Sequence, residues 1–219
     1  MPYKAAIFDL DGTLIDSVRD IAESMNRSLA AMGFPIHPVE QYNYFIGEGV
    51  QVLVERALPA GARDEASVKK FMDGYRLDYL QNWNVHTTIY PGIPEFLHRM
   101  VAAGIPMGVL SNKPDLATRK CVEHFFPDIP FIYVAGQRDG IPRKPDPLPA
   151  LEIATAINLP PEQCVFIGDT AVDMQTAVAA GMFPAGVSWG FRTEEELITH
   201  GARLIAHTPE VLAALFINP

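Results

Sequence analysis

The chain has 219 residues, 48% of them hydrophobic, with a net charge of −9 and a pI near 5.1. This length supports one domain with a substantial core, or one domain that carries an insertion. An acidic chain without a run of basic residues lacks the surface that neutralises nucleic acid. No stretch reaches the roughly 18 uninterrupted apolar residues of a membrane span. We therefore expect no nucleic-acid partner and no membrane partner.

The first predicted element is a strand at residues 4–9, which ends in the sequence Asp9-x-Asp11-Gly12-Thr13. Gly12 permits a tight turn at this point, and Thr13 offers a hydroxyl and an amide to an anion. Two carboxylates this close repel each other unless a cation, a shared proton or a reaction intermediate makes use of them. The pattern therefore suits an attacking carboxylate beside an acid/base carboxylate, with a metal between them.

Two features of the chain indicate its compartment. The first strand lies so near the N-terminus that removal of a signal peptide would remove Asp9. Two cysteines, Cys121 in a predicted helix and Cys164 at the start of a predicted strand, are too few for a disulfide scaffold. We expect a cytoplasmic protein.

Residues 16–88 contain no predicted strand, and helical periodicity dominates them. Apolar residues recur at helical spacing in three stretches: Val18, Ile21, Met25 and Leu29; Val52, Leu53 and Ala57; and Phe71, Tyr75 and Tyr79. This pattern predicts a helical domain inserted after the first strand. We expect a helical cap at 16–88 and a core formed by 1–15 and 89–219.

Beyond residue 92, short apolar runs alternate with helical patterns. Strands are predicted at 105–110, 131–135, 164–168 and 184–187, and helices at about 93–103, 115–125, 147–158 and 170–180. The remaining predicted elements are a short helix at 193–200, a strand at 202–206 and a closing helix from Pro209. This alternation predicts an α/β fold in which helices cover both faces of a doubly wound parallel sheet.

Three further polar sequences lie near the ends of predicted core elements. Ser111-Asn112 follows one strand, and Asp169 ends another with Asp173 four residues later. Lys144 lies in a proline-bracketed segment ahead of a helix, where a rigid backbone aims one ammonium group. Ligands of an open parallel sheet bind beyond the carboxyl ends of its strands, so these side chains and the first motif are expected to converge.

These four sequences, in this order, resemble those of the haloacid dehalogenase superfamily, and the resemblance covers essentially the whole chain. It implies a Rossmann-like core whose helical cap closes over the site, and phosphoryl transfer through an aspartyl-phosphate. Within the superfamily, the chain most resembles the phosphoglycolate phosphatases.

The resemblance implies a catalytic role for three residues. Asp9 is expected to be the nucleophile that attacks phosphorus. Asp11 is expected to protonate the leaving alkoxide and then to activate water. Lys144 is expected to offset the repulsion between the anionic nucleophile and the anionic phosphate.

Magnesium is the expected cofactor, because an all-oxygen set of carboxylates and phosphate suits Mg²⁺. Asp169 is expected to bind the metal together with Asp9 and, by resemblance, the backbone carbonyl of Asp11. Asp173 is expected to make an outer or water-mediated contact with the metal. Compensation of charge at a helix N-terminus is the alternative for Asp173.

The expected substrate-binding residues are Thr13, Ser111, Asn112, Lys113 and Gly47. Ser111 and Asn112 are expected to hold the phosphoryl oxygens, whereas Lys113 could equally be exposed. Gly47 belongs to a cap segment that resembles the specificity loop of the family, with a plain helix-start turn as the alternative. An acidic substrate also needs a further cation, and three cap arginines are available: Arg27, Arg56 and Arg63.

The second acid decides the reaction class that the resemblance implies. Dehalogenases and phosphonatases of the superfamily lack or replace the residue that corresponds to Asp11, whereas the sugar-phosphate mutases retain it. Mutases usually carry Asp-Gly-Val where this chain has Asp11-Gly12-Thr13. We expect a Mg²⁺-dependent phosphomonoester hydrolase of a small phosphorylated metabolite, with 2-phosphoglycolate as the first candidate. The alternatives, in order, are a pyrophosphatase or other small-metabolite phosphatase of this cap type, a mutase, and a catalytically silent binding protein. The sequence leaves the oligomeric state open.

Overall fold

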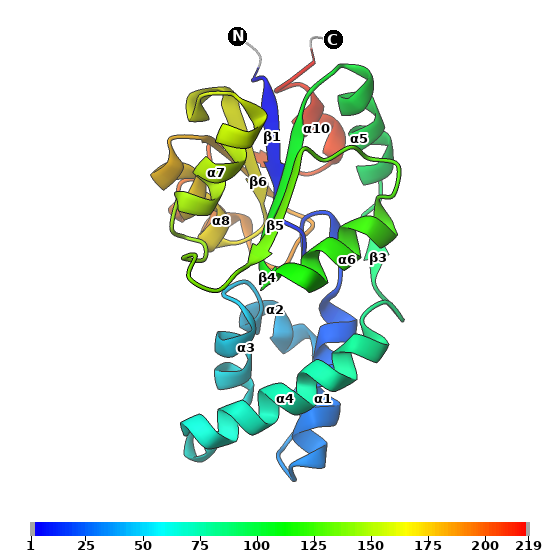
Figure 1. Ribbon diagram of the computed structural model, residues 1–219, viewed down its shortest axis with the longest axis vertical. Helices are drawn as coiled ribbons and strands as arrows, with labels where there is room; N and C mark the ends of the chain where they lie inside the picture. The colour runs from blue at the N-terminus through cyan, green and yellow to red at the C-terminus, as the bar shows by residue number, and fades with distance from the viewer. Residues whose placement is uncertain (1–2, 218–219) are drawn as a thin grey trace.

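A parallel six-stranded sheet lies at the centre of the core, in the order β5-β4-β1-β6-β7-β8 (Figure 1). The computed structural model describes residues 3–217. The strands are β1 (Ala5–Phe8), β4 (Met107–Pro114), β5 (Tyr133–Gln137), β6 (Cys164–Gly168), β7 (Phe183–Val187) and β8 (Leu204–Ala206). Because β1 lies between β4 and β6, the motif that follows β1 lies at the middle of the carboxyl edge of the sheet.

Helices cover both faces of this sheet, which confirms the predicted α/β architecture. One face carries α5 (Ile93–Ala102), α6 (Asp115–Phe125) and α10 (Pro209–Ala213), and the other carries α7 (Leu148–Ile157), α8 (Ala171–Ala180) and α9 (Glu194–Thr199). Alternate residues of β1 face opposite sides of the sheet. Ala6 and Phe8 pack in the apolar cluster of α5 and α6, whereas Ala5 and Ile7 pack in that of α7 and α8. All four are fully buried, which is why the strand is continuously apolar.

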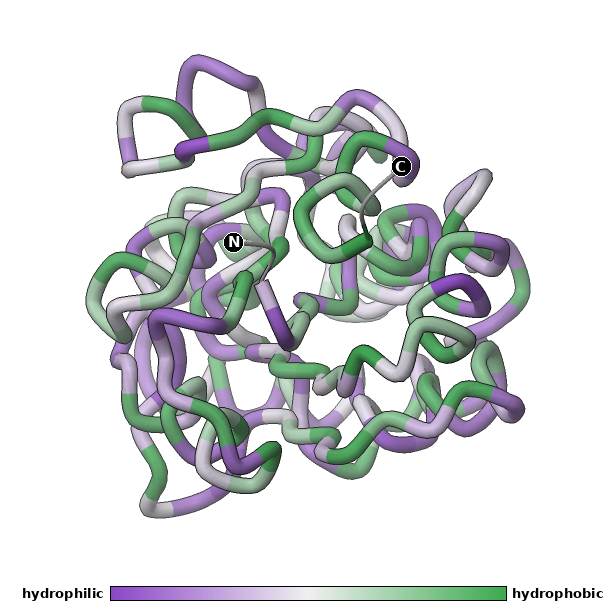
Figure 2. The backbone as a smooth tube through the Cα atoms, turned by 90° about the horizontal axis from the view of Figure 1, so that it is seen from above, coloured by the Kyte–Doolittle hydropathy of each residue, from purple (hydrophilic) through white to green (hydrophobic). Residues whose placement is uncertain are grey.

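Four helices form the cap, beyond the carboxyl ends of the strands (Figure 1). They are α1 (Val18–Ala31), α2 (Tyr42–Phe45), α3 (Val50–Ala57) and α4 (Glu65–Asn82). Helix α1 packs against α4, with Met25 and Leu29 in the same apolar cluster as Phe71 and Tyr75. The backbone changes repeatedly between hydrophobic and hydrophilic stretches, as expected for helices that bury one side (Figure 2). The helical cap is thus confirmed, and its bounds at 16–88, with 1–15 and 89–219 as the core, stay a prediction.

Short strands at the junction of cap and core correct the prediction for 16–88. The strands β2 (Ile15–Asp16) and β3 (Thr88–Ile89) pair antiparallel where the chain leaves and re-enters the core. A two-residue strand is too short to display a period, so the expectation of no strand in this region was wrong at its two ends. Strand β4 also continues to Pro114 through a change of register after Leu110, beyond the predicted 105–110. The other predicted core elements begin and end within two residues of the observed ones.

Both cysteines are buried free thiols, Cys121 on α6 and Cys164 at the start of β6. Over residues 3–217, the structure contains no helix with the length and apolar character that crossing a bilayer requires.

Phe96 anchors α5 to the sheet and provides a test of this core. It is 2% exposed, and its ring lies edge-on to Phe8 with the centroids 6.0 Å apart. We expect Phe96→Ala to lower the free energy of unfolding by about 3–5 kcal/mol, because the substitution leaves a cavity. Leu77→Ala, at a leucine that is 67% exposed, is expected to change it by less than about 0.5 kcal/mol. Urea denaturation measures the free energy of unfolding of both variants. Equal losses in the two would contradict the central position of Phe96 in the core.

Candidate active site

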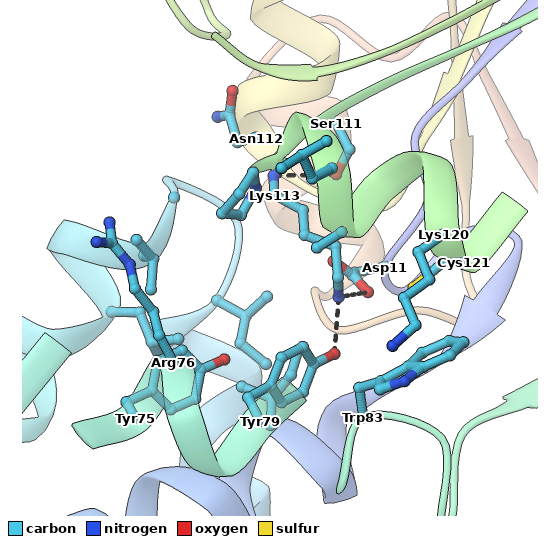
Figure 3. Close-up of a pocket in the computed structure, with 18 of the residues that line it drawn as sticks. Asp11, Tyr75, Arg76, Tyr79, Trp83, Ser111, Asn112, Lys113, Lys120 and Cys121 are labelled. Atoms are coloured by element: carbon cyan, nitrogen blue, oxygen red, sulfur yellow. Dashed lines mark hydrogen bonds and ion pairs between the residues drawn. The ribbon is translucent and has the colours of Figure 1, made fainter. Parts of the chain in front are cut away.

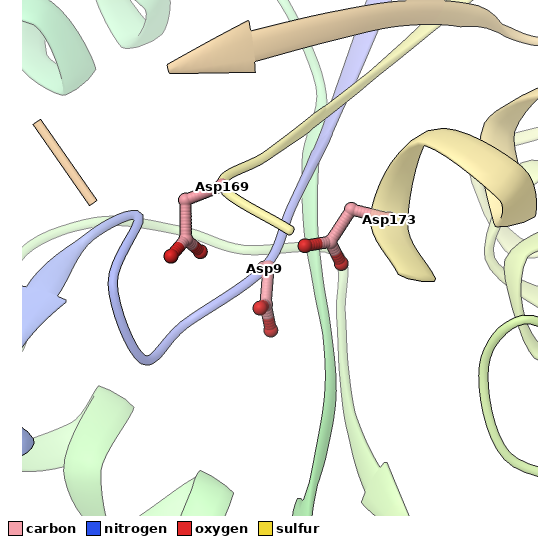
Figure 4. A group of neighbouring side chains, drawn as sticks. All are labelled: Asp9, Asp169 and Asp173. Carbon is pink, nitrogen blue, oxygen red and sulfur yellow. The ribbon is translucent and has the colours of Figure 1, made fainter. Parts of the chain in front are cut away.

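The carboxyl ends of two neighbouring strands and the first turn of the helix after the second strand bring the predicted acidic residues together. Asp9 directly follows β1, Asp169 directly follows β6, and Asp173 lies in the first turn of α8. All three are buried, and one carboxylate oxygen of each lies within 4.8 Å of the other two (Figure 4). Parallel strands therefore place residues that are 160 positions apart in the chain around one point.

The ammonium group of Lys144 lies between two of these carboxylates. Its Nζ is 2.9 Å from Asp9 Oδ1 and 2.7 Å from Asp173 Oδ1. Burial raises the pKa of Asp9 to about 7, although Lys144 acts in the opposite direction. Burial and the neighbouring carboxylates also hold the pKa of Asp169 well above its ordinary value. Ionisation of all three carboxylates against one ammonium would leave two negative charges unbalanced, so the cluster favours a further cation.

The donor set of this cluster fits a divalent metal ion of the hard, oxygen-binding kind. Asp169 is fixed by the Thr13 hydroxyl, which donates to Oδ1 at 2.9 Å, and by the Phe191 N–H, which donates to Oδ2 at 2.8 Å. A Cβ on Gly12 or Gly190 would overlap the Asp169 side chain, and Gly12 has φ +88°. The Thr13 hydroxyl thus positions a candidate metal ligand, and its expected contact with the substrate stays a prediction.

Asp173 makes the contacts of a helix cap as well as those of the cluster. Its Oδ2 accepts hydrogen bonds from the N–H and the hydroxyl of Thr170, at 3.0 and 2.7 Å. Its Oδ1 accepts the hydrogen bond from Lys144. Asp173 therefore lies at the helix N-terminus, as the alternative interpretation expected, and caps it. The same side chain also fixes Lys144 beside Asp9.

The carboxylate of Asp9 is held by one of its oxygens. The Leu10 N–H donates to Oδ1 at 2.7 Å, and Lys144 lies against the same atom. Among residues 3–217, no hydrogen-bond donor contacts Oδ2, and Asp9 lines the cavity between cap and core. A carboxylate with one oxygen fixed, on a residue that lines a cavity, suits the role of a nucleophile.

Two donors from different elements hold Asp11. The Ser17 hydroxyl donates to Oδ1 at 2.6 Å, and the Lys113 ammonium donates to both oxygens at 3.0 and 3.1 Å (Figure 3). Lys113 also contacts the Tyr79 hydroxyl at 2.8 Å. Burial lowers the pKa of Lys113, but the attraction of Asp11 outweighs this and the pKa lies well above its ordinary value.

Lys113 is therefore buried rather than exposed, and its expected role in substrate binding stays a prediction. Because β4 continues through this position, its side chain enters the buried space beside Asp11. Ser17 and Tyr79 were not predicted as site residues. Ser17 precedes a helix and reads as a cap, whereas Tyr79 belongs to an apolar helical period, so neither carries a signal for the site in the sequence.

Asn112 and Gly47 join the cap to the core. The Asn112 side-chain amide donates to the carbonyls of Gly47 and Lys144, each at 3.0 Å. This amide nitrogen is thus engaged with the backbone, and the expected role of Asn112 in holding phosphoryl oxygens stays a prediction. Ser111 lies beside the cluster with its hydroxyl accepting a hydrogen bond from the Lys113 N–H at 3.2 Å.

A cavity of about 360 Å³ lies between cap and core, with Asp9, Asp11 and Ser111 among its lining residues (Figure 3). The three cap arginines expected as candidates do not line it. Each makes its contact within the cap: Arg27 with Asp78, Arg56 with Glu48, and Arg63 with the Leu58 carbonyl. Arg76 of α4 lines the cavity in their place.

The hydrogen bond from Lys113 to Tyr79 provides a test of the contact between cap and core. We expect Tyr79→Phe to lower the free energy of unfolding by about 1.5–3 kcal/mol, because a buried ammonium loses a partner. Tyr75 stacks on Tyr79 with the centroids 5.5 Å apart and is the matched control. Tyr75→Phe is expected to change stability by less than about 0.5 kcal/mol. Thermal and urea unfolding measure both, and equal losses would contradict the assigned role of the Tyr79 hydroxyl.

Comparison with known proteins agrees with the motifs and the fold. Two curated relatives are called phosphoglycolate phosphatase. That of Pseudomonas putida is 32% identical over 218 residues, covering 95% of this chain and 75% of its own. That of Psychrobacter arcticus is 33% identical over 209 residues, covering 90% of this chain and 88% of its own.

A solved protein of Lactobacillus delbrueckii subsp. bulgaricus superposes with a TM-score of 0.93 at 31% identity, covering 100% of both chains. A haloacid dehalogenase-like hydrolase of Streptococcus pneumoniae shares the fold, with a TM-score of 0.86 at 24% identity and coverage of 97% of this chain and 98% of its own. Residues 6–187 match the family model of the haloacid dehalogenase-like hydrolases. The chain belongs to the haloacid dehalogenase-like hydrolase family.

Proposed function

We propose that this protein is a metal-dependent phosphomonoester hydrolase that works through an aspartyl-phosphate on Asp9. The buried cluster of Asp9, Asp169 and Asp173 around the Lys144 ammonium carries the proposal. Membership of a hydrolase family supports hydrolysis, and the names of the two curated relatives support a phosphate ester. The carboxylate donor set supports Mg²⁺ as the metal.

The reaction has two halves that use the same two acids. Asp9 attacks phosphorus, the bond from phosphorus to the ester oxygen breaks, and Asp11 gives its proton to the leaving alkoxide. Asp11 then removes a proton from a water molecule, which attacks the aspartyl-phosphate and releases inorganic phosphate and the Asp9 carboxylate. Ser17 and Lys113 hold Asp11 in place for both transfers.

Charge compensation is the other requirement of this reaction. Lys144, fixed by Asp173, lies against Asp9 and offsets the repulsion that an anionic phosphate meets there. We assign the metal to Asp9 and Asp169, with Asp173 near it and the Asp11 backbone carbonyl as a further donor. Bound there, the ion would neutralise charge on the transferring phosphoryl group.

The proposed substrate is a small phosphorylated metabolite. The names of the relatives make 2-phosphoglycolate the first compound to test. The two buried free thiols support a reducing, cytoplasmic location for the protein.

Phosphate release with and without metal tests the proposal. The substrates are 2-phosphoglycolate, pyrophosphate, pyridoxal phosphate and p-nitrophenyl phosphate, each with Mg²⁺ and with a chelator. We expect release with Mg²⁺ and a loss of about 100-fold or more in the chelator, because the charge on the phosphoryl group is then unneutralised. Release that is equal in both conditions would contradict the metal assignment. No release from any ester would contradict the hydrolase itself.

A further inference from the structure

The cavity that leads away from Asp9 has walls that phosphoryl transfer alone does not require. Beyond its catalytic end, these walls are largely apolar and aromatic: Ile46, Val50, Leu53, Tyr75, Leu80 and Trp83. They come mainly from the cap, with α6 of the core opposite them. The volume of about 360 Å³ lies in the range of pockets that enclose a ligand, so the leaving group of a substrate would occupy this apolar part.

The cavity offers no buried cation free to pair with a second anionic group close to the phosphate, among residues 3–217 that line it. Among residues 3–217, the cationic side chains that line it are Arg76, Lys113 and Lys120. Lys113 is ion-paired with Asp11 at 3.0 Å, and its other recorded side-chain contact is the Tyr79 hydroxyl. Arg76 and Lys120 are exposed. A carboxylate attached one carbon from the phosphate ester would therefore meet an apolar wall, which is costly for an unpaired charge.

The residues at the opening of the cavity are also apolar. Leu80 on α4 and Leu116 on α6 line the cavity and are 61% and 84% exposed. The Lys120 ammonium lies 4.7 Å from the centre of the Trp83 ring, which fixes that aromatic face at the cavity (Figure 3). An apolar leaving group would extend along these side chains and remove them from water.

We infer that the preferred substrate is the phosphate monoester of an apolar alcohol, about the size of a six-carbon chain or a benzyl group. The inference rests on the proposed function and narrows its substrate class. A two-carbon leaving group such as glycolate fills only the inner end of the cavity. The apolar walls contribute to binding only for a substrate whose leaving group has carbon atoms that reach them.

A homologous series of esters tests this inference. Ethyl, propyl, hexyl and benzyl phosphate all release a primary alkoxide, so their chemical reactivity is nearly matched, and 2-phosphoglycolate serves as the reference. We expect kcat/KM to rise about fourfold for each methylene that enters the cavity. Hexyl phosphate should exceed propyl phosphate by at least about tenfold, and benzyl phosphate should exceed 2-phosphoglycolate. A flat series, or a preference for 2-phosphoglycolate, overturns the inference and leaves the hydrolase intact. No release from any ester overturns the proposed function, and the inference with it.

Two leucines of α4 provide matched variants for the same assay. Leu80 and Leu77 are 61% and 67% exposed, and only Leu80 is among the residues that line the cavity. We expect Leu80→Ser to lower the ratio of kcat/KM for hexyl over propyl phosphate by about threefold, whereas Leu77→Ser leaves this ratio unchanged. Val50→Thr, which exchanges a methyl group for a hydroxyl inside the cavity, should lower the ratio as well. An unchanged ratio in both Leu80→Ser and Val50→Thr would overturn the position assigned to the leaving group.

Discussion

Asp9→Asn is expected to abolish phosphate release, with a fall in kcat of roughly 10⁴-fold or more, because an amide does not attack phosphorus as a carboxylate does. The substitution keeps the size of the side chain and the oxygen that accepts the Leu10 hydrogen bond. A loss of this size therefore reports on the chemistry of the carboxylate rather than on its packing.

The same substitution is expected to preserve or raise the stability of the metal-free protein. Asp9 lies buried beside Asp169 and Asp173, and its raised pKa reflects the cost of burying the charge. Removal of one of three neighbouring negative charges relieves their repulsion. A variant that is inactive but at least as stable as the parent would separate function from folding at this position.

Phosphate release and thermal unfolding in a chelator measure the two effects of Asp9→Asn. Asp139→Asn, at an exposed loop position, is the control that changes neither. Retention of more than about one hundredth of the parent activity would contradict the assignment of Asp9 as nucleophile. A large loss of stability would contradict the proposed repulsion within the cluster.

Lys144→Met is expected to remove activity and stability together. The substitution leaves the buried carboxylates of Asp9 and Asp173 without their cation, which costs about 3–5 kcal/mol of unfolding free energy. Phosphate release is expected to fall by about 100-fold or more, because the anionic phosphate meets an uncompensated nucleophile. Urea unfolding and phosphate release measure the two losses, with Lys70→Met at an exposed position of α4 as the control.

A second substitution separates the two roles of Lys144. In the double variant Lys144→Met with Asp173→Asn, one buried charge is removed and asparagine retains an oxygen for the Thr170 contacts. Stability is expected to recover in part, whereas activity stays lost. If Lys144→Met were as stable as Lys70→Met, the contribution to stability assigned to the ion pairs around Lys144 would be contradicted.

The core of the fold was predictable because its strands are buried on both faces. Ala5 to Phe8 and Cys164 to Gly168 are continuous apolar runs, and each ends where an acidic residue follows. The pairing of β2 with β3 was not predictable, since two residues display no period. The extension of β4 to Pro114 depends on its pairing with Gln137 across a change of register, which no local pattern contains.

The sequence by itself determined which groups lie at the carboxyl edge of the sheet. Asp9 and Asp169 end parallel strands, and parallel strands present their carboxyl ends to one crevice whatever the loops between them do. The tertiary structure alone decided which of these groups bind each other. Lys113 pairs with Asp11 and Tyr79, and the cavity is apolar beyond Asp9, because the cap faces the end of β4 and brings Tyr79 of α4 to Lys113. Such contacts depend on distances between two parts of the molecule, and the order of residues along the chain does not specify them.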